Sequence, residues 1–394
     1  MANAETTAAK LRGNWHYPTE VLFGAGRLAE LADATKQMGM QKPLFVTDVG
    51  LANLDFVKSA LADLSAGGVG AALFSAVQPN PTGQNVFDGV NTYHQGQHDG
   101  VITLGGGSAL DVGKAVALMV GQSLPLWAFE DIGDNWQQVN IKGMAPVIAI
   151  PSTAGTGSEV GRSSVIIHEE QCLKKIIFHP NMLPGLVIAD PEITLGLPAH
   201  ITAATGVDAF VHNLEAFCAP GYHPMAEGIA VEGMRLIKDN LPLAFHQGNN
   251  LIARSHLMVA SSMGATAFQK GLGGVHALAH PLGALYNAHH GLLNAIILPY
   301  VLQRNMPVIA RKLTYLARVL ELEQQTADGF MAWLLAYLRE LQIPTDLKSI
   351  GIDEAQAMRV GQMAVQDAAA GGNPIALTAE DYQAVFLTAV RGTL

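Results

Sequence analysis

The chain has 394 residues, of which 49% are hydrophobic and 14% are charged, and its formal net charge is -10. This length is sufficient for two or more packed domains, and the low charge content argues against a disordered chain. The acidic balance predicts no nucleic-acid partner, the lack of a long apolar run predicts no membrane span, and two cysteines cannot form a disulfide framework, so we expect a cytoplasmic protein.

The first half of the chain alternates short β-branched runs with helical patterns. Strands are predicted over residues 43–48, 71–77, 100–108, 145–153 and 185–191. Helices are predicted over residues 26–39 and 108–121. Alternation of this kind is typical of a mainly parallel sheet that is covered by helices on both faces.

The second half of the chain reads as helices. After residue 192 the strand signals fade, and helical patterns cover residues 226–245, 253–268, 294–320 and 328–342. We therefore expect an α/β domain over residues 1–192 and an all-α domain over residues 193–394. The stretch from about 310 to 394 carries no functional motif and is interpreted as helical packing.

The segment VITLGGGSALDVGK, residues 101–114, combines a strand, a glycine turn and the start of a helix. Gly105, Gly106 and Gly107 permit close approach of the backbone, and Ser108 with the helix N-terminus offers hydrogen-bond donors to a phosphate. Glycine turns after strands are common, so the turn alone is a weak sign of a diphosphate cradle.

Two further features suit a dinucleotide. Asp48 ends the run LFVTD, and a carboxylate there would accept hydrogen bonds from ribose hydroxyls and repel a 2′-phosphate, which favours NAD over NADP. The second small-residue loop, PSTAGTGSEVG over residues 151–161, also follows a predicted strand and could line the same site.

Four histidines, His276, His280, His289 and His290, lie within fifteen residues of the chain. His276 and His280 are four residues apart, a spacing that places two side chains on one face of a helix, although Pro281 predicts a kink there. The same spacing relates Asp208 and His212 in the apolar stretch TGVDAFVHNLEAF.

Each pair alone has an ordinary explanation. An Asp/His pair at this spacing is usually a surface pair, and an HxxxH pair beside proline is often a core or capping feature. Two such pairs in apolar surroundings in the same half of the chain favour a metal site. One carboxylate with three imidazoles, from Asp208, His212, His276 and His290, suits Fe(II) or Zn(II) and is too rich in nitrogen for Mg or Ca.

Together these motifs resemble the iron-containing (group III) alcohol dehydrogenase family. The matching stretches run in the family's order from about residue 17 to about residue 300: EVLFGAG, VTD, PNPT, GGGSALDVGK, PSTAGTGSEV, ADPEIT, TGVDAFVHNLEAF and GLGGVHALAHPLGALYNAHHG. The resemblance implies a dehydroquinate-synthase-like fold, an active site between the two domains and a homodimer or larger assembly.

The resemblance also implies roles for individual residues. It implies that Asp208, His212, His276 and His290 bind iron, with zinc possible, and that His280 lies near the nicotinamide and substrate. The cofactor contacts that it implies are Asp48, Asn80, Gly105, Gly106, Gly107, Ser108, Thr153, Thr156 and Lys174. His289 is interpreted as an exposed or supporting residue. The implied reaction is hydride transfer between NAD(H) and a short-chain primary alcohol or aldehyde.

The sequence departs from the common family pattern beside the expected substrate pocket. It has Arg162 in GSEVGRSSV, and Ala267 and Lys270 in ATAFQKGLG, where Ala267 replaces a frequent aromatic residue. We hypothesise that Arg162, Lys270 or both bind an anionic group on the substrate, such as the carboxylate of 4-hydroxybutyrate. The alternative is that both face solvent or pair with nearby acids.

Three other functions remain open. One is a lyase of the dehydroquinate synthase type, which would need a basic cluster for a phosphate-bearing substrate, and no such cluster lies near the metal motifs. Another is polyol oxidation of the glycerol dehydrogenase kind, although the stretch HALAHPLGALYNAHHG fits the alcohol dehydrogenase branch better. A non-catalytic metal or nucleotide binder is the third.

Overall fold

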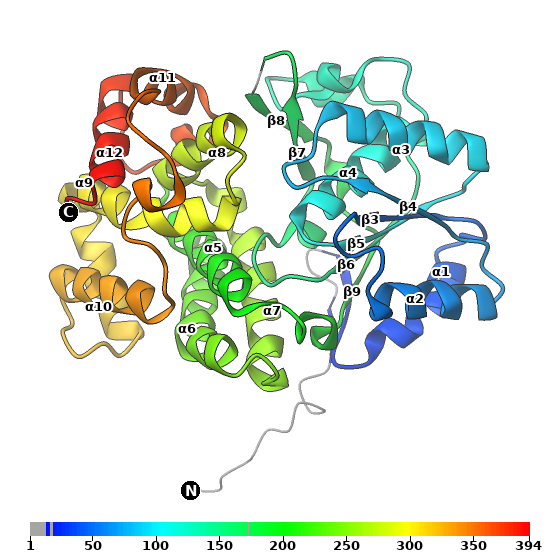
Figure 1. Cartoon of the computed structure of the whole chain (residues 1–394), viewed down its shortest axis with the longest axis horizontal. Coiled ribbons are helices and arrows are strands. Elements are labelled where there is room, and N and C mark those ends of the chain that lie inside the picture. The colour runs from blue at the N-terminus through cyan, green and yellow to red at the C-terminus, as the bar shows by residue number, and fades with distance from the viewer. Residues whose placement is uncertain (1–12, 16–18, 172) are drawn as a thin grey trace, which may run out of the picture. The chain divides into compact units, whose positions relative to one another are not determined.

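The protein is described here over residues 13–15, 19–171 and 173–394 of a computed structural model (Figure 1). The chain divides into two compact units. The first runs to Thr153 and continues over Gly157–Gly196, and the second contains Ala154–Thr156 and Leu197–Leu394. The main division therefore falls after Gly196, whereas the sequence predicted a boundary after residue 192.

The first unit is built on a seven-stranded sheet. Its strands lie in the order β1-β2-β9-β6-β5-β3-β4, and all neighbours are parallel except β1 and β2. The bounds are β1 Gly13–Trp15, β2 Glu20–Phe23, β3 Leu44–Asp48, β4 Ala72–Val77, β5 Val101–Gly105, β6 Val147–Pro151 and β9 Leu186–Ala189. The mainly parallel sheet confirms the predicted α/β class of this half.

Helices cover both faces of this sheet (Figure 1). Side chains alternate along β3: Leu44 and Val46 pack with α3 and α4, whereas Phe45 packs with α1 and α2. These helices are α1 Leu31–Gln37, α2 Asp55–Ala66, α3 Gly83–Gly96 and α4 Gly107–Met119. Burial on both faces explains why the central strands are continuous apolar runs in the sequence.

Four strands were not predicted from the sequence. β1 and β2 are short, and β1 lies at the edge of the sheet, where a strong apolar pattern is not required. The other two form a separate antiparallel hairpin of β7 Ser163–His168 and β8 Leu173–Phe178. The hairpin is half-buried on most of its length, so its alternation in the sequence is weak.

The second unit is helical, as predicted, and has one continuous core. Its helices are α5 Ala199–Cys218, α6 Pro224–His246, α7 Leu251–Ala267, α8 Gly274–Tyr286, α9 His290–Val319, α10 Ala327–Glu340, α11 Ala357–Gln366 and α12 Ala379–Arg391. Prolines lie inside α6, α8 and α9, and α8 continues through Pro281. His276 and His280 therefore stand on one helix despite the proline that follows them.

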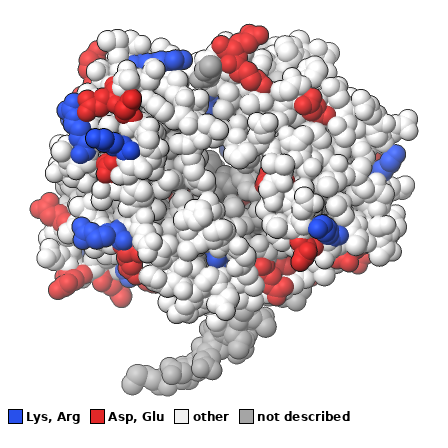
Figure 2. Space-filling view, in the orientation of Figure 1, with Lys and Arg blue, Asp and Glu red and all other residues white. Residues whose placement is uncertain are grey.

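Charged side chains are sparse on one face of the molecule (Figure 2). On the face that Figure 2 shows, basic and acidic side chains are scattered among uncharged residues, and several stand beside one another. Within the described ranges, no helix combines the length and the apolar character that crossing a bilayer requires.

Candidate active site

Helix α5 carries three ionisable side chains on one face. Asp208, His212 and Glu215 are spaced four and three residues apart, so their side chains follow one another along the helix. All three are buried, with exposed fractions of 4%, 5% and 7%. Buried charged groups require partners, and this face of α5 is where the histidines of the later helices meet.

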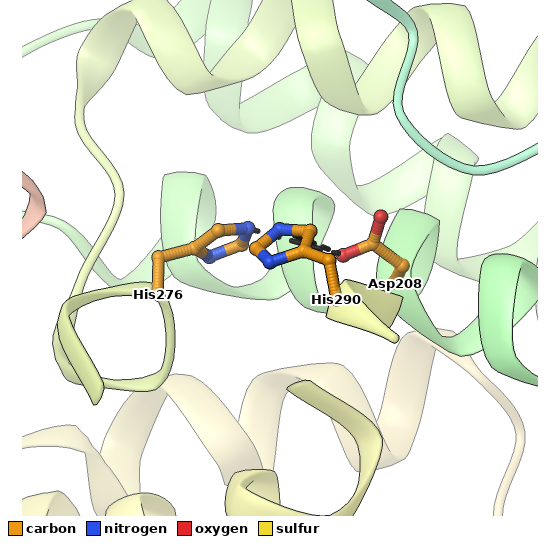
Figure 3. A group of neighbouring side chains, drawn as sticks. All are labelled: Asp208, His276 and His290. Atoms are coloured by element: carbon orange, nitrogen blue, oxygen red, sulfur yellow. Dashed lines mark ion pairs between the residues drawn. The ribbon is translucent and has the colours of Figure 1, made fainter. Parts of the chain in front are cut away.

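The Asp208 carboxylate lies at the centre of three imidazoles. Its Oδ1 atom is 3.9 Å from the Nε2 atom of His212, 3.9 Å from that of His276 and 3.9 Å from that of His290. Figure 3 shows His276 and His290 directed toward the same carboxylate oxygen. His276 stands in the first turn of α8 and His290 is the first residue of α9. Three separate helices therefore bring these four side chains together.

Three of these side chains are close enough together to hold one metal ion, and His212 lies beside them. The donor atoms of Asp208, His276 and His290 all lie within 4.8 Å of one another. His212 joins this group by its distance to Asp208 and by stacking on His276, with ring centroids 4.7 Å apart. Metal–ligand bonds of about 2.1 Å imply ligand atoms roughly 3.4 Å apart in a tetrahedron, so small side-chain movements would close the set.

The protonation of His212 suits metal binding, and burial with hydrogen bonding acts differently on His276. Burial, opposed in part by the charge of Asp208, lowers the pKa of His212 to about 4, so this ring is neutral at pH 7. Its Nδ1 atom lies 3.2 Å from the carbonyl oxygen of Gly155, an acceptor, which leaves Nε2 as the lone-pair atom. Burial alone would lower the pKa of His276, but the hydrogen bond and charge of Glu215 outweigh it and raise that pKa.

Asn294 is a residue of this site that the sequence analysis missed. Its Nδ2 atom donates a hydrogen bond of 2.6 Å to Asp208 Oδ1 and lies 3.2 Å from Nε2 of both His276 and His290. An amide N–H approaches such nitrogen atoms only where they present lone pairs. Asn294 follows His290 by four residues on α9, so helical spacing was a usable signal.

His280 lies beside the four expected ligands. Its ring stacks on His290 with centroids 5.4 Å apart and meets the ring of His276 edge-on at 5.9 Å. The Nδ1 atom of His280 lies 2.8 Å from Oδ2 of Asp367. His289 has a different role, because its side chain accepts a hydrogen bond from the backbone of Leu292 and caps α9.

Several of the expected cofactor residues lie together in the first unit, where β3, β5 and β6 end side by side. A Cβ atom built on Gly105 would be 3.3 Å from Oδ2 of Asp48, and one on Gly106 would be 3.7 Å from Oγ1 of Thr153. Gly105 has a φ of +156°, which favours glycine. Ligands of open α/β sheets bind at the carboxyl ends of the strands, so this edge is a suitable nucleotide site.

The remaining cofactor candidates occupy three places. Gly107 and Ser108 open α4, whose N-terminus follows the glycine turn. Lys174, near the start of strand β8, donates a hydrogen bond of 2.9 Å from Nζ to Oδ1 of Asn80, so these two residues lie together. Thr156 belongs to the second unit.

The three substrate candidates lie in different environments. Arg162 is exposed, with its guanidinium 5.7 Å from the centroid of the Phe178 ring. Ala267 is fully buried in the helical core. The Lys270 side chain is only 1% exposed, and its Nζ donates to Oε1 of Glu227 at 2.6 Å. Lys270 is thus paired with a nearby acid, the alternative that the sequence left open.

The sequence matches two protein-family models that together cover most of the chain. Residues 18–191 match the model "Iron-containing alcohol dehydrogenase", and residues 202–390 match "Fe-containing alcohol dehydrogenase family, C-terminal". The chain belongs to the iron-containing alcohol dehydrogenase family. The predicted family and the predicted fold class are therefore confirmed, and hydride transfer is favoured over the lyase alternative.

Relatives of this alcohol dehydrogenase cover almost its whole length. A 4-hydroxybutyrate dehydrogenase from Cupriavidus necator is 36% identical and aligns over 93% of this chain and 97% of its own length. An NAD-dependent methanol dehydrogenase from Bacillus methanolicus is 30% identical over 96% and 100% of the two chains. A solved 1,3-propanediol oxidoreductase is 33% identical, covers 94% and 97%, and superposes with a TM-score of 0.89. As a member of the iron-containing alcohol dehydrogenase family, this chain is an oxidoreductase.

Proposed function

We propose that Asp208, His212, His276 and His290 hold one divalent metal, iron or zinc, and that an alcohol or aldehyde reacts beside it. The observation that carries this proposal is the equal distance of 3.9 Å from Asp208 Oδ1 to three imidazole Nε2 atoms. A bound metal would supply Lewis-acid activation of the alcohol oxygen.

The side chains around the site have separate tasks in this proposal. His280 lies against two of the metal ligands, so its imidazole is the group available to take up or return a proton near the substrate. Asp48, Asn80, the Gly105–Ser108 turn, Thr153, Thr156 and Lys174 would bind NAD. Asp48 would accept hydrogen bonds from the ribose and disfavour a 2′-phosphate.

The experiment starts from metal-stripped protein. Fe(II) or Zn(II) is added without oxygen, and NADH absorbance is followed with a panel of neutral and carboxylated alcohols. We expect metal-dependent NAD reduction that is lost in His276→Ala. Turnover that is unchanged by metal removal, or by His276→Ala, would contradict the proposed centre.

We further propose that the substrate is a short primary alcohol with an anionic end, such as 4-hydroxybutyrate. The named activity of the Cupriavidus necator relative supports this class. Because the ammonium of Lys270 is paired with Glu227, the proposal rests on the exposed guanidinium of Arg162. Equal kcat/KM for 4-hydroxybutyrate and 1-butanol, with no change in Arg162→Ala, would contradict it.

We also propose a cellular location and an oligomeric state for this enzyme. We expect the enzyme to act in the cytoplasm and to assemble as a homodimer or larger oligomer. Sedimentation of the purified protein at several concentrations would measure the assembly.

A further inference from the structure

We propose that Glu215 is a positioning residue for the metal centre, which holds the His276 ring in the one tautomer and orientation that can bind the ion. This inference rests on the proposed metal site and adds to it a residue outside the four ligands. Glu215 lies on α5, on the same face as Asp208 and His212, and its carboxylate is 7% exposed.

The carboxylate of Glu215 makes three hydrogen bonds, all as an acceptor. Its Oε2 atom lies 2.7 Å from Nδ1 of His276 and accepts from the backbone N–H of Gly273 at 2.9 Å. Its Oε1 atom accepts from the backbone N–H of Val275 at 2.7 Å. The ring nitrogen Nδ1 must therefore carry the proton, which leaves the lone pair on Nε2, the atom that faces Asp208.

The glycines that precede His276 make this contact possible. A Cβ atom on Gly273 would lie 2.9 Å from Oε1 of Glu215, closer than real Cβ atoms approach. The N-cap of α8 is Gly273, which has no capping side chain, so Glu215 satisfies N–H groups that the helix itself leaves free. The same carboxylate thus fixes the start of α8 and the ring of its third residue.

An amide could not replace this carboxylate. Both oxygens of Glu215 face donors, whereas glutamine presents one oxygen and one NH2 group. With its NH2 group on the Val275 side, glutamine would oppose a backbone N–H. With its NH2 group on the other side, it would favour the His276 tautomer that is protonated on Nε2, and that nitrogen could then not bind the metal. Removal of the charge would also weaken the basicity of the ligand.

Asn373 provides a matched control in the same place. Its Oδ1 accepts from the backbone N–H of Gly274 at 3.0 Å and from Nδ2 of Asn305 at 2.8 Å. It therefore caps the same helix start as Glu215, and none of its hydrogen bonds reaches an imidazole. A purely structural role of Glu215 in fixing α8 would be shared by Asn373, whereas an effect through His276 would not.

The test is a Co(II) titration of the metal-stripped, full-length protein, with the visible Co(II) spectrum and the dissociation constant as readouts. For Glu215→Gln we expect a spectrum that differs from that of the wild type and binding weaker by about 10- to 100-fold. For Asn373→Ser we expect the wild-type spectrum and binding within about threefold, because the imidazole keeps its carboxylate. Glu215→Asp keeps the charge on a shorter side chain, so its affinity for Co(II) should fall between those of the wild type and Glu215→Gln. If Glu215→Gln does not fold, Glu215→Asp is used in its place.

The outcomes separate the two proposals. If wild-type protein binds Co(II) no better than His276→Ala, the metal site itself is wrong. If wild type binds Co(II) and Glu215→Gln, or Glu215→Asp in its place, matches it in affinity and spectrum, the positioning role is wrong. An equal loss in Asn373→Ser and the Glu215 variant would also overturn it, because the effect would then come from the start of α8.

Discussion

His280 and Asp367 form a hydrogen-bonded pair across 87 positions of the sequence, with 2.8 Å between Nδ1 and Oδ2. Asp367 follows α11 and also caps the short 3-10 helix Ala368–Gly372 by accepting from the backbone of Ala369. The C-terminal stretch, which has no motif that the sequence analysis could use, therefore contributes a carboxylate beside the proposed reaction site.

Asp367→Asn should lower kcat without weakening metal binding. The carboxylate accepts from Nδ1 of His280 and keeps Nε2 of that ring unprotonated, whereas asparagine can also donate and permits the other tautomer. We expect kcat to fall by about 10- to 100-fold, the effect usual for such supporting partners. Steady-state kinetics at saturating metal, with the Co(II) affinity measured in parallel, test this. A wild-type kcat would contradict the role of the pair.

Asn294→Asp should make the protein more dependent on metal for its stability. The introduced carboxylate would replace an amide that donates to Asp208 Oδ1 at 2.6 Å, so two carboxylates would face each other in the metal-stripped protein. A divalent ion would relieve that repulsion. We expect a lower Tm than wild type without metal and a larger increase in Tm on addition of Zn(II). An increase equal to that of the wild type would refute this expectation.

Lys270→Met should reduce stability and leave substrate preference unchanged. The Lys270 ammonium is buried against Glu227 and the carbonyl oxygen of Phe217, so its removal leaves a partly buried carboxylate with Lys312 3.5 Å away as a remaining partner. We expect a loss of about 1–3 kcal/mol in the free energy of unfolding. The ratio of kcat/KM for 4-hydroxybutyrate and 1-butanol should stay at the wild-type value. A selective loss with 4-hydroxybutyrate would return Lys270 to the substrate site.

The thiol of Cys218 should make stability fall at alkaline pH. Burial raises the pKa of Cys218 from 9.0 to about 12. Above pH 9 the unfolded thiol therefore loses its proton while the folded thiol keeps it, so stability is lost as pH rises from 9 toward 12. The slope from this group is about 1.4 kcal/mol per pH unit.

Denaturant unfolding at a series of pH values measures this slope. The comparison is between Cys172→Ser protein and the same protein with Cys218→Ala added. The double variant should lose stability less steeply above pH 9. Parallel curves would show that the Cys218 thiol does not contribute.

Asp48→Asn should relax the preference for NAD. Asparagine can still accept the hydrogen bond that Asp48 Oδ1 takes from the backbone of Leu51 at 3.0 Å, so the local turn is retained while the charge is lost. We expect the ratio of kcat/KM for NAD over NADP to fall by roughly tenfold, because a 2′-phosphate is no longer repelled. An unchanged ratio would place the nucleotide ribose elsewhere.

The sequence predicted those parts of the molecule whose signals are local. β3, β5 and β6 are buried on both faces and appear as apolar runs, and the helical spacing of Asp208 and His212 is visible in the sequence alone. The hairpin of β7 and β8 and the strand β2 were missed because partial exposure and short length weaken their alternation.

Residues that meet only in the tertiary structure could not be identified from their spacing in the sequence. Glu215 stands within a motif that the sequence analysis quoted, but its partner His276 is 61 residues away, and only the folded structure, which brings the start of α8 to this carboxylate, reveals the contact. Asp367 and Asn373 are farther still from His280 and Gly274, at 87 and 99 positions. No local periodicity relates such residues.

The close approach of Gly273 to Glu215 also constrains how this protein can diverge. A side chain at position 273 would collide with the carboxylate, and an apolar residue at position 215 would leave the backbone N–H groups of Gly273 and Val275 without their acceptor. Neither position can change first without a penalty. We therefore expect positions 215 and 273 to co-vary among related proteins. Glycine at position 273 should be required where position 215 is glutamate, and other residues should occur at position 273 only where the glutamate is absent.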